Sequence, residues 1–295
     1  MKPTTGGSTT RPLFKSLMGL CLLLLLTAGP AAGEPAIALF DALQQRLVAD
    51  GYDADRIGTL YEDERVLFEV QGVAAYFRHN EATLNYDQFL QSNYIEEARA
   101  YLNAHAQWFE MAEQRFAVDP KVITAIILVE TKFGRFVGNR AILNTLSTMA
   151  SLTQSGPREY LWRQLPAERR FDRARFDQRA DQRSEWAYRE LKAFLTYTTD
   201  HGIDAPAVVG SYAGAMGIAQ FMPTNILAYA VDGNEDGRID LFDHPDAILS
   251  IASYLKRHGW KPGLDRRQAG RVVYHYNHSR YYVDTILNIV DLLKG

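Results

Sequence analysis

The segment ILVETKFG (127–134) places one carboxyl group at the end of an apolar run. Helical spacing puts Glu130 on one face with Ile123, Ile126 and Ile127, where a protein core is expected. Burial raises a carboxyl pKa, and the negative end of a helix dipole acts in the same direction. A carboxyl group that keeps its proton near neutral pH can serve as a general acid. This spacing therefore indicates proton-transfer chemistry at Glu130.

A structural role for Glu130 is the competing interpretation at this point. Burying an unpaired carboxylate is costly, and Lys132 or Arg135 in the residues that follow could neutralise it by forming an ion pair. One glutamate in an apolar helix is a weak signal. Other segments of the chain must therefore decide between the two interpretations.

Two further segments have the composition of a sugar-binding groove. GSYAGAMGIAQFMPT (210–224) combines small residues, which permit close backbone approach, with hydroxyl, amide and aromatic side chains. YHYNHSRYY (274–282) interleaves aromatic rings with an amide and two histidines. Flat aromatic faces beside polar groups suit sugar rings, which have apolar faces and polar edges. Packing of a helical core explains each segment equally well when it is taken alone.

A twelve-residue acidic loop is the candidate metal site. DGNEDGRIDLFD (232–243) nearly fits the EF-hand calcium loop, with Gly237 at the turning position. Its last position holds aspartate where glutamate is usual, and an Asx-rich turn without an ion is the alternative. His275 and His278 lie in no HExxH pattern and are interpreted as groove or packing residues, not as zinc ligands. The predicted calcium ligands are Asp232, Asn234, Asp236, Arg238 through its carbonyl oxygen, and Asp243, with Asp240 near the ion.

Helical periodicity dominates the rest of the chain. One helix is expected to begin after an Asp119 cap, with Pro120 at its first position, and to stop at Gly134. A short strand is expected within 65–77. The arginine-rich stretch 158–189 fits either a salt-bridged surface or a contact for an anionic polymer. The apolar spacing predicts further helices at 94–116, 184–198, 245–258 and 282–293.

Composition and charge narrow the classes of function. The 295 residues are 47% hydrophobic and 23% charged, which is typical of a globular chain. A formal net charge of −3 gives no basic footprint, so nucleic-acid binding is not expected. The single cysteine, Cys21, lies in the N-terminal segment. A mature chain without it has no disulfide, no thiol nucleophile and no cysteine metal ligand.

Residues 1–33 have the pattern of a secretory signal peptide. Positive charges precede the apolar run 17–28, which is short for a membrane span, and small residues at Ala31 and Gly33 fit a cleavage site. Leu20 before Cys21 is bulkier than lipoprotein processing normally accepts. We therefore expect a soluble exported protein in the periplasm with no stable membrane span after cleavage. An uncleaved membrane anchor is the alternative.

Three blocks of the chain, in this order, resemble the lytic murein transglycosylase B family. They are ILVETKFGRFVGNRAILNTLSTMA, then GSYAGAMGIAQFMPTNILAYAVDGNEDGRIDLFDHPDAILSIASYLKRHGW, then YHYNHSRYY. The resemblance implies a mainly α, lysozyme-like helical catalytic domain over residues 94–295, with room for a small β element. Residues 34–93 match the family poorly, so their role is open.

The resemblance also implies a reaction and the residues that perform it. The reaction is cleavage of the β-1,4 bond between N-acetylmuramic acid and N-acetylglucosamine in peptidoglycan, with a 1,6-anhydromuramoyl product and Glu130 as the single general acid and base. Peptidoglycan strands and other cell-wall enzymes are the implied partners, and the implied cofactor is a structural Ca²⁺ ion with no organic group. The residues implied to line the glycan groove are Ser211, Met216, Gln220, Phe221, Tyr254, Tyr276, Asn277 and Tyr282.

Three alternatives to a lytic transglycosylase stay open. A muramidase would hydrolyse the same bond with water, a scaffold protein would bind peptidoglycan without turnover, and a calcium-dependent module would be purely structural. The segment between Trp260 and Tyr276 is short, whereas fuller members of the family carry a long insertion there. We therefore expect part of one groove wall to be missing.

Overall fold

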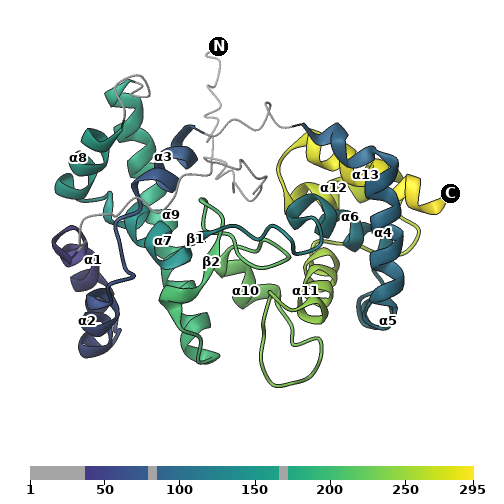
Figure 1. Ribbon diagram of the computed structural model, residues 1–295, viewed down its shortest axis with the longest axis horizontal. Helices are drawn as coiled ribbons and strands as arrows, with labels where there is room; N and C mark the ends of the chain where they lie inside the picture. The colour runs from purple at the N-terminus through teal and green to yellow at the C-terminus, as the bar shows by residue number, and fades with distance from the viewer. Residues whose placement is uncertain (1–36, 79–84, 166–171) are drawn as a thin grey trace, which may run out of the picture.

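The computed structural model describes residues 37–78, 85–165 and 172–295, and the fold is mainly helical as expected (Figure 1). The predicted signal peptide lies outside the described residues. None of the helices in the described ranges is long and apolar enough to cross a membrane. In chain order the elements are α1 (Ile37–Ala49), α2 (Ala54–Glu62), α3 (Val70–Arg78), the 3-10 helix η2 (Tyr86–Leu90), α4 (Ser92–Ala104), α5 (Ala106–Phe116), α6 (Pro120–Thr131), β1 (Arg140–Ala141), α7 (Ile142–Ser151), α8 (Ser155–Gln164), α9 (Arg173–Asp200), the 3-10 helix η4 (Ala205–Ala207), β2 (Val209–Gly210), α10 (Pro223–Tyr229), α11 (His244–Arg257), α12 (Arg266–Tyr276) and α13 (Arg280–Lys294).

The helices form two lobes joined by a short central region (Figure 1). One lobe contains α1, α2, α3, α7, α8 and α9, with α7 packed along α9. The other contains α4, α5, α6, α11, α12 and α13, with α13 packed against α6 and α11 against α5. Strands β1 and β2 and helix α10 lie between the lobes. The two strands pair antiparallel, with Arg140 opposite Gly210.

Helix α6 forms where the sequence predicts it. The Asp119 side chain accepts a hydrogen bond from the backbone N–H of Lys121, and Pro120 occupies the first helical position. Every residue from 122 to 131 is buried, so this is a core helix with no solvent-facing stripe. The helix ends at Thr131, slightly before the predicted stop at Gly134, because Lys132 already has left-handed backbone angles.

Two predictions about elements are wrong. Residues 94–116 form two helices, because the chain breaks at His105, whose ring lies 4.4 Å from that of Tyr101 and 4.5 Å from that of His244. The segment 65–77 does not form the expected strand, since helix α3 begins at Val70. Its apolar residues Val73 and Phe77 are four positions apart and both buried, which is helical spacing.

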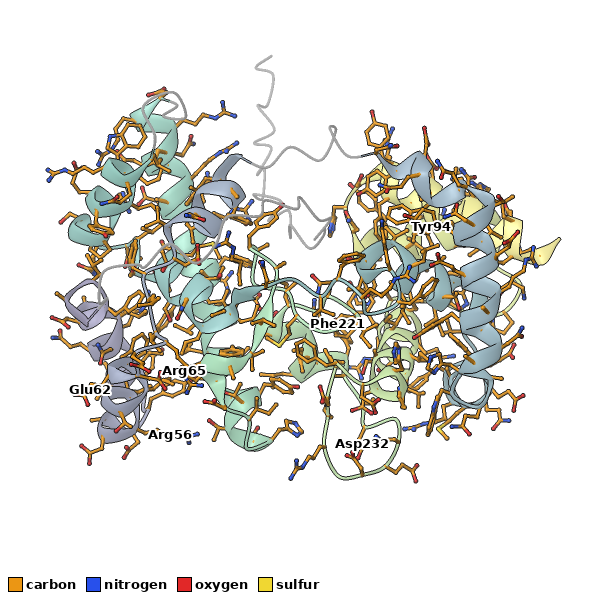
Figure 2. The ribbon with its side chains drawn as sticks, in the orientation of Figure 1. Arg56, Glu62, Arg65, Tyr94, Phe221 and Asp232 are labelled. Atoms are coloured by element: carbon orange, nitrogen blue, oxygen red, sulfur yellow. The ribbon has the colours of Figure 1, made fainter. Side chains whose placement is uncertain are left out.

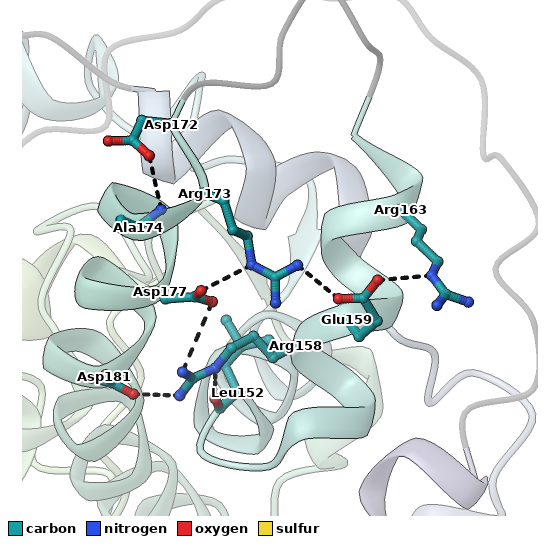
Figure 3. Close-up of polar contacts among 9 residues, drawn as sticks. All are labelled: Leu152, Arg158, Glu159, Arg163, Asp172, Arg173, Ala174, Asp177 and Asp181. Atoms are coloured by element: carbon teal, nitrogen blue, oxygen red, sulfur yellow. Dashed lines mark hydrogen bonds and ion pairs between the residues drawn. The ribbon is translucent and has the colours of Figure 1, made fainter.

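The remaining helix predictions are confirmed, and the arginine-rich stretch forms ion pairs. Residues 184–198 lie within α9, 245–258 within α11 apart from the last residue, and 282–293 within α13. Figure 3 shows the network between α8 and α9, where Arg173 binds Asp177 at 2.9 Å and Glu159 at 2.7 Å. Arg158 binds Asp181 in the same network. These contacts support the salt-bridged surface as the interpretation of this stretch.

Candidate active site

Glu130 is buried at the end of α6 and meets a tyrosine from α13. Its side chain is 3% exposed, and the Tyr282 hydroxyl donates a hydrogen bond of 2.8 Å to its Oε1 atom. Tyr282 is itself positioned by the start of α13, where its backbone N–H donates to Ser279 Oγ at 3.3 Å. The two cations considered as neutralising partners bind other groups. Lys132 Nζ donates to the Tyr94 hydroxyl at 2.8 Å, and Arg135 pairs with Glu97 at 2.5 Å.

Four predicted groove residues form one aromatic cluster beside Glu130. The rings of Tyr282 and Tyr276 are nearly parallel, with centroids 6.4 Å apart. Tyr276 also contacts Phe221 at 5.9 Å and Tyr254 at 5.1 Å. Burial raises the pKa of Tyr276 and of Tyr282 well above the ordinary tyrosine value, and the neighbouring Glu130 charge acts in the same direction. Both hydroxyl groups therefore stay protonated and act as hydrogen-bond donors.

The tyrosine hydroxyls of this cluster bind backbone carbonyl groups. Tyr276 donates to the carbonyl oxygen of Ala219, and Tyr254 donates to that of His275 at 2.7 Å. All the rings of the cluster are buried. The Tyr276 hydroxyl thus holds the segment at Ala219 and the Tyr254 hydroxyl holds the end of α12, while the part of these residues in a glycan groove stays a prediction.

The segment between β2 and α10 is held by its own hydrogen bonds. Ser211 Oγ accepts from the backbone N–H groups of Ala213 at 3.2 Å and Ala215 at 3.0 Å. Met216 is fully buried and exchanges two backbone bonds with Phe221, at 3.0 and 3.1 Å. The two bonds between Met216 and Phe221 close a short turn that contains Gln220. They therefore fix the direction of the Gln220 side chain.

Gln220 joins this segment to the chain that follows α6. It has a positive φ of 48°, and its Nε2 atom donates to the carbonyl oxygens of Val137 at 3.0 Å and Gly217 at 2.9 Å. Its Oε1 atom is buried and has no hydrogen-bond partner among the described residues. The same holds for Asn277 Nδ2 and His278 Nδ1. Leaving a buried polar atom unsatisfied costs about 1–3 kcal/mol, so these atoms are candidates for contact with a ligand or water.

The acidic loop 232–243 folds as a set of Asx turns. Asp232 accepts from the N–H of Gly237 at 2.7 Å, and Asp236 accepts from that of Arg238 at 2.9 Å. The Asn234 amide lies between Asp236 and Asp243, to which it donates at 3.3 and 3.0 Å. Within the described ranges, no cluster of three or more His, Cys, Asp or Glu side chains is arranged to hold a metal ion. The side chains of Asn234, Asp236 and Asp243 are thus brought together but bind one another, and Asp232 binds backbone N–H groups.

Several residues that position the site were missed by the sequence analysis. Asp246 is buried and accepts from the N–H groups of Gly233 at 2.7 Å and Asp240 at 2.6 Å, which fixes the acidic loop at two points. Burial raises its pKa. Tyr86 lies before the predicted domain, yet its ring packs at 86° to that of Tyr282, 6.3 Å away. An acid in a first helical turn and a lone tyrosine carry no signal of such roles.

A cavity of about 710 Å³ lies elsewhere in the molecule, between α2, the end of α9 and η4. None of the predicted site residues lines it. Figure 2 shows Arg56, one of its lining residues, in the outer part of one lobe, with Phe221 between the lobes and Tyr94 in the other. The cavity is therefore separate from Glu130.

Comparisons with known proteins give one matching family and several similar structures. Residues 37–269 match the family model described as "Transglycosylase SLT domain". Membrane-bound lytic murein transglycosylase B of Escherichia coli is 35% identical over 185 residues, which cover 62% of this chain and 44% of that protein. The match thus spans less than half the length of this curated relative.

The similar solved structures show the same fold at low sequence identity. Soluble lytic transglycosylase SltB1 from Pseudomonas aeruginosa has a TM-score of 0.70 and 24% identity, covering 87% of this chain and 98% of its own. SltB3 from the same organism, in complex with NAG-NAM-pentapeptide, has a TM-score of 0.69 and 23% identity, with coverage of 89% and 80%. Escherichia coli Slt35 in complex with calcium has a TM-score of 0.66 and 23% identity, with coverage of 90% and 94%.

Proposed function

The chain belongs to the transglycosylase SLT domain family, and from this premise we propose that it is a lytic transglycosylase. The substrate is peptidoglycan, and the bond cleaved is the β-1,4 bond between N-acetylmuramic acid and N-acetylglucosamine. The observation that carries the proposal is the buried carboxyl group of Glu130 with the Tyr282 hydroxyl on its Oε1 atom. Residues 94–295 form the proposed catalytic domain, and the family match beginning at residue 37 includes the helices before it, whose match the sequence analysis expected to be poor.

One carboxyl group performs both proton transfers in this mechanism. Glu130 protonates the leaving glycosidic oxygen, and the substrate's own N-acetyl group steadies the positive charge at the anomeric carbon. The carboxylate then accepts the proton of the muramic acid 6-hydroxyl as that oxygen attacks, which closes the 1,6-anhydro ring. Because the nucleophile is part of the substrate, its effective concentration is high and no water needs activation.

Tyr282 has a defined part in this cycle. Its hydroxyl donates to Glu130 Oε1, so the proton that is transferred resides on Oε2. The same hydrogen bond stabilises the carboxylate formed after the first transfer. Burial raises the pKa of Tyr282, which keeps its proton on the phenol oxygen throughout.

The residues of the proposed glycan site fall into two groups. Gln220 and Asn277 each carry a buried polar atom with no partner among the described residues, and we assign these atoms to the substrate's hydroxyl and acetamido groups. The other members fix the shape of this surface from behind or through their backbone bonds. They are Ser211, Met216, Phe221, Tyr254, Tyr276 and Tyr282.

Product analysis on purified sacculi tests the proposal. Anhydro ends are lighter than reducing ends by one water, so mass spectrometry of the digest separates a transglycosylase from a hydrolytic muramidase. Reducing ends would contradict the mechanism above and favour the muramidase. Binding of sacculi without release of muropeptides would favour a non-catalytic scaffold.

We further propose that the acidic loop binds a structural Ca²⁺ ion. The donor set consists of hard oxygen ligands from Asp232, Asn234, Asp236 and Asp243 and from the carbonyl group of Arg238, which suits calcium. Gly237 has a φ of +88° and open space around it, as the sharp turn in an EF-hand loop needs. The Asn234 side chain would have to turn its oxygen inward, replacing its contacts with Asp236 and Asp243.

Export to the periplasm is the corresponding proposal for location. The predicted signal peptide 1–33 and the peptidoglycan substrate both point there, and other cell-wall enzymes are the expected partners. N-terminal sequencing of the protein from a periplasmic extract should give a chain beginning near Glu34. Recovery of the whole sequence in the membrane fraction would favour the uncleaved anchor.

A further inference from the structure

One hydroxyl group, that of Thr131, holds the end of α6 just after Glu130. Its side chain is 1% exposed, and Oγ1 accepts a hydrogen bond of 3.0 Å from the N–H of Gly134. Oγ1 lies 3.1 Å from the carbonyl oxygen of Ile218 and 3.4 Å from that of Ile127. A hydroxyl has one proton, so it donates to Ile218, the nearer acceptor. The Thr131 hydroxyl thus binds the segment between β2 and α10 and not the Ile127 carbonyl group of its own helix.

The turn that this hydroxyl closes has an unusual backbone. Lys132, Phe133 and Gly134 have successive φ values of +47°, +63° and +80°, and two of the three are not glycine. Left-handed angles at non-glycine residues cost energy and persist only where the surroundings fix them. The bond from the Gly134 N–H to Thr131 Oγ1 connects the two ends of this turn. Its loss would loosen the turn next to Glu130, which would then depend on backbone bonds such as that from the Lys132 N–H to the Leu128 carbonyl oxygen at 3.0 Å.

The contact continues from Ile218 into the acidic loop. The N–H of Ile218 donates to the carbonyl oxygen of Leu241 at 2.7 Å. A Cβ atom on Gly217 would lie 2.5 Å from both the Cβ and the carbonyl oxygen of Leu241, so only glycine allows this approach. A single residue, Ile218, thus connects Thr131 through its carbonyl oxygen to the loop 232–243 through its N–H group.

A second contact from the acidic loop reaches the same turn. His244 follows the last loop residue, and its Nδ1 atom lies 2.7 Å from the Tyr101 hydroxyl. The Tyr101 ring stacks on Phe133 with centroids 4.6 Å apart and an angle of 24°. The end of the loop is therefore connected to the left-handed turn by the rings of His244, Tyr101 and Phe133, in addition to the backbone bonds of Ile218.

We propose that Thr131 is a positioning residue for Glu130 and that it couples the carboxyl group to the acidic loop through Ile218 and Leu241. The inference rests on the proposed function, in which Glu130 transfers the proton. Glu130 and Thr131 share a peptide bond, so relaxation of the turn rotates the carboxyl group away from the glycosidic oxygen. A displacement of about 1 Å can cost about 100-fold in rate.

A matched pair of threonines on α6 tests the positioning role. Thr124 is also buried, at 0% exposed, but its hydroxyl binds the carbonyl oxygen of Pro120 within the same helix at 2.9 Å. Thr131→Val should lower kcat about 10- to 100-fold with KM within about twofold, whereas Thr124→Val should leave both near wild type. Thr131→Ser, which keeps the hydroxyl, should restore kcat. Equal losses in the two valine variants, or a loss confined to thermal stability, would overturn the proposal.

A measurement without glycan keeps the two proposals separable. Amide exchange at Gly134 and Ile218, and the ¹³C titration of the Glu130 carboxyl group, should change in Thr131→Val and stay the same in Thr124→Val. If wild type releases no muropeptides, the proposed function fails, and unchanged exchange in Thr131→Val would overturn the positioning role independently. Asp246→Asn, which loosens the acidic loop, should shift the Glu130 signal more in wild type than in Thr131→Val, where only the path through Tyr101 and Phe133 remains. Additive effects would overturn the coupling.

Discussion

Two buried glutamates, one in each lobe, show what burial alone does not provide. Glu130 on α6 and Glu190 on α9 are 3% and 5% exposed. Both oxygens of Glu190 accept bonds from Thr224, from its N–H and its hydroxyl, each at 2.9 Å. Glu130 instead receives the Tyr282 hydroxyl and lies against the tyrosine cluster.

The difference separates a structural carboxylate from the carboxyl group that we propose transfers the proton. Glu190 fixes the first turn of α10 to α9, a task that a neutral amide can share. Glu130 meets a phenol that stays protonated, in a region where Gln220 and Asn277 carry buried polar atoms without partners among the described residues. The character of the partners, and not the depth of burial, distinguishes the two sites.

The strongest test of this contrast is the exchange of each glutamate for glutamine. Glu130→Gln should lower the rate of muropeptide release by about 1000-fold or more, because a general acid alone contributes about 10²–10⁴ and this residue has two tasks. Its fold and glycan binding should stay intact. Glu190→Gln should keep most of the activity. Cleavage by Glu130→Gln at near the wild-type rate would refute the assignment.

Removal of the phenol hydroxyl sharpens the contrast within the tyrosine cluster. Tyr282→Phe should lower kcat about 10- to 100-fold, since a hydrogen bond to a charged group contributes about 1.5–3 kcal/mol. Tyr254→Phe is the matched control, because its buried hydroxyl binds the His275 carbonyl group and not Glu130. It should affect stability alone. Equal kcat values for the two variants would remove Tyr282 from the mechanism.

The acidic loop should respond to calcium through stability. Asp232→Ala should lower Tm in calcium buffer by several degrees relative to wild type and by much less in chelator. Ion binding at 100 times Kd contributes about 2.7 kcal/mol, and 1 kcal/mol corresponds to roughly 2–4 °C for a protein of this size. Equal shifts in the two buffers would count against an ion in the loop.

The smallest expected effect is on the pH dependence of stability. Burial raises the pKa of Glu190, although the bonds from Thr224 oppose the shift. A carboxyl group with a raised folded pKa contributes stability below its unfolded pKa, and this contribution is lost as pH rises through the folded value. Glu190→Gln should therefore show a shallower fall in the free energy of unfolding above pH 4.5, the ordinary glutamate value.

Glu185 on the same helix provides a control of opposite sign. The Arg46 guanidinium holds the pKa of Glu185 below its ordinary value. Its contribution is present above the unfolded pKa and is lost as pH falls. Glu185→Gln should thus flatten the acid side of the profile. Identical profiles for the two variants would show that burial of Glu190 has no energetic consequence.

Local signals explain what the sequence predicted about the fold. A cap at Asp119, proline at the first position and an uninterrupted apolar run define α6 without reference to the rest of the chain. The chain breaks at His105, whose ring contacts that of His244 far along the sequence, whereas periodicity alone made one helix of two. The stop at Lys132 was missed because a left-handed cap at a lysine has no residue signature.

The site shows the same division between local and distant causes. Glu130 follows an apolar run in a helix that is buried on every side, so its place in the core could be predicted from the run itself. Its contact with Tyr282 joins residues 152 positions apart, and no pattern marks it. Aromatic residues such as Phe221 and Tyr276 look alike as groove walls and as packing residues, because composition carries no information on which side of a ring is covered.

The single pair of short strands in the described part of the chain has a consequence for how this fold can change. Pairing of Arg140 with Gly210, extended by the bond from the Ile142 N–H to the Val208 carbonyl group, brings both ends of the intervening chain to one place. Changes of chain length after the end of α8 and before the start of α9 would leave that junction and the neighbouring Val137 carbonyl undisturbed. Size variation across relatives should accordingly accumulate between these two helices, while the proposed chemistry constrains the chain on the other side of the strands.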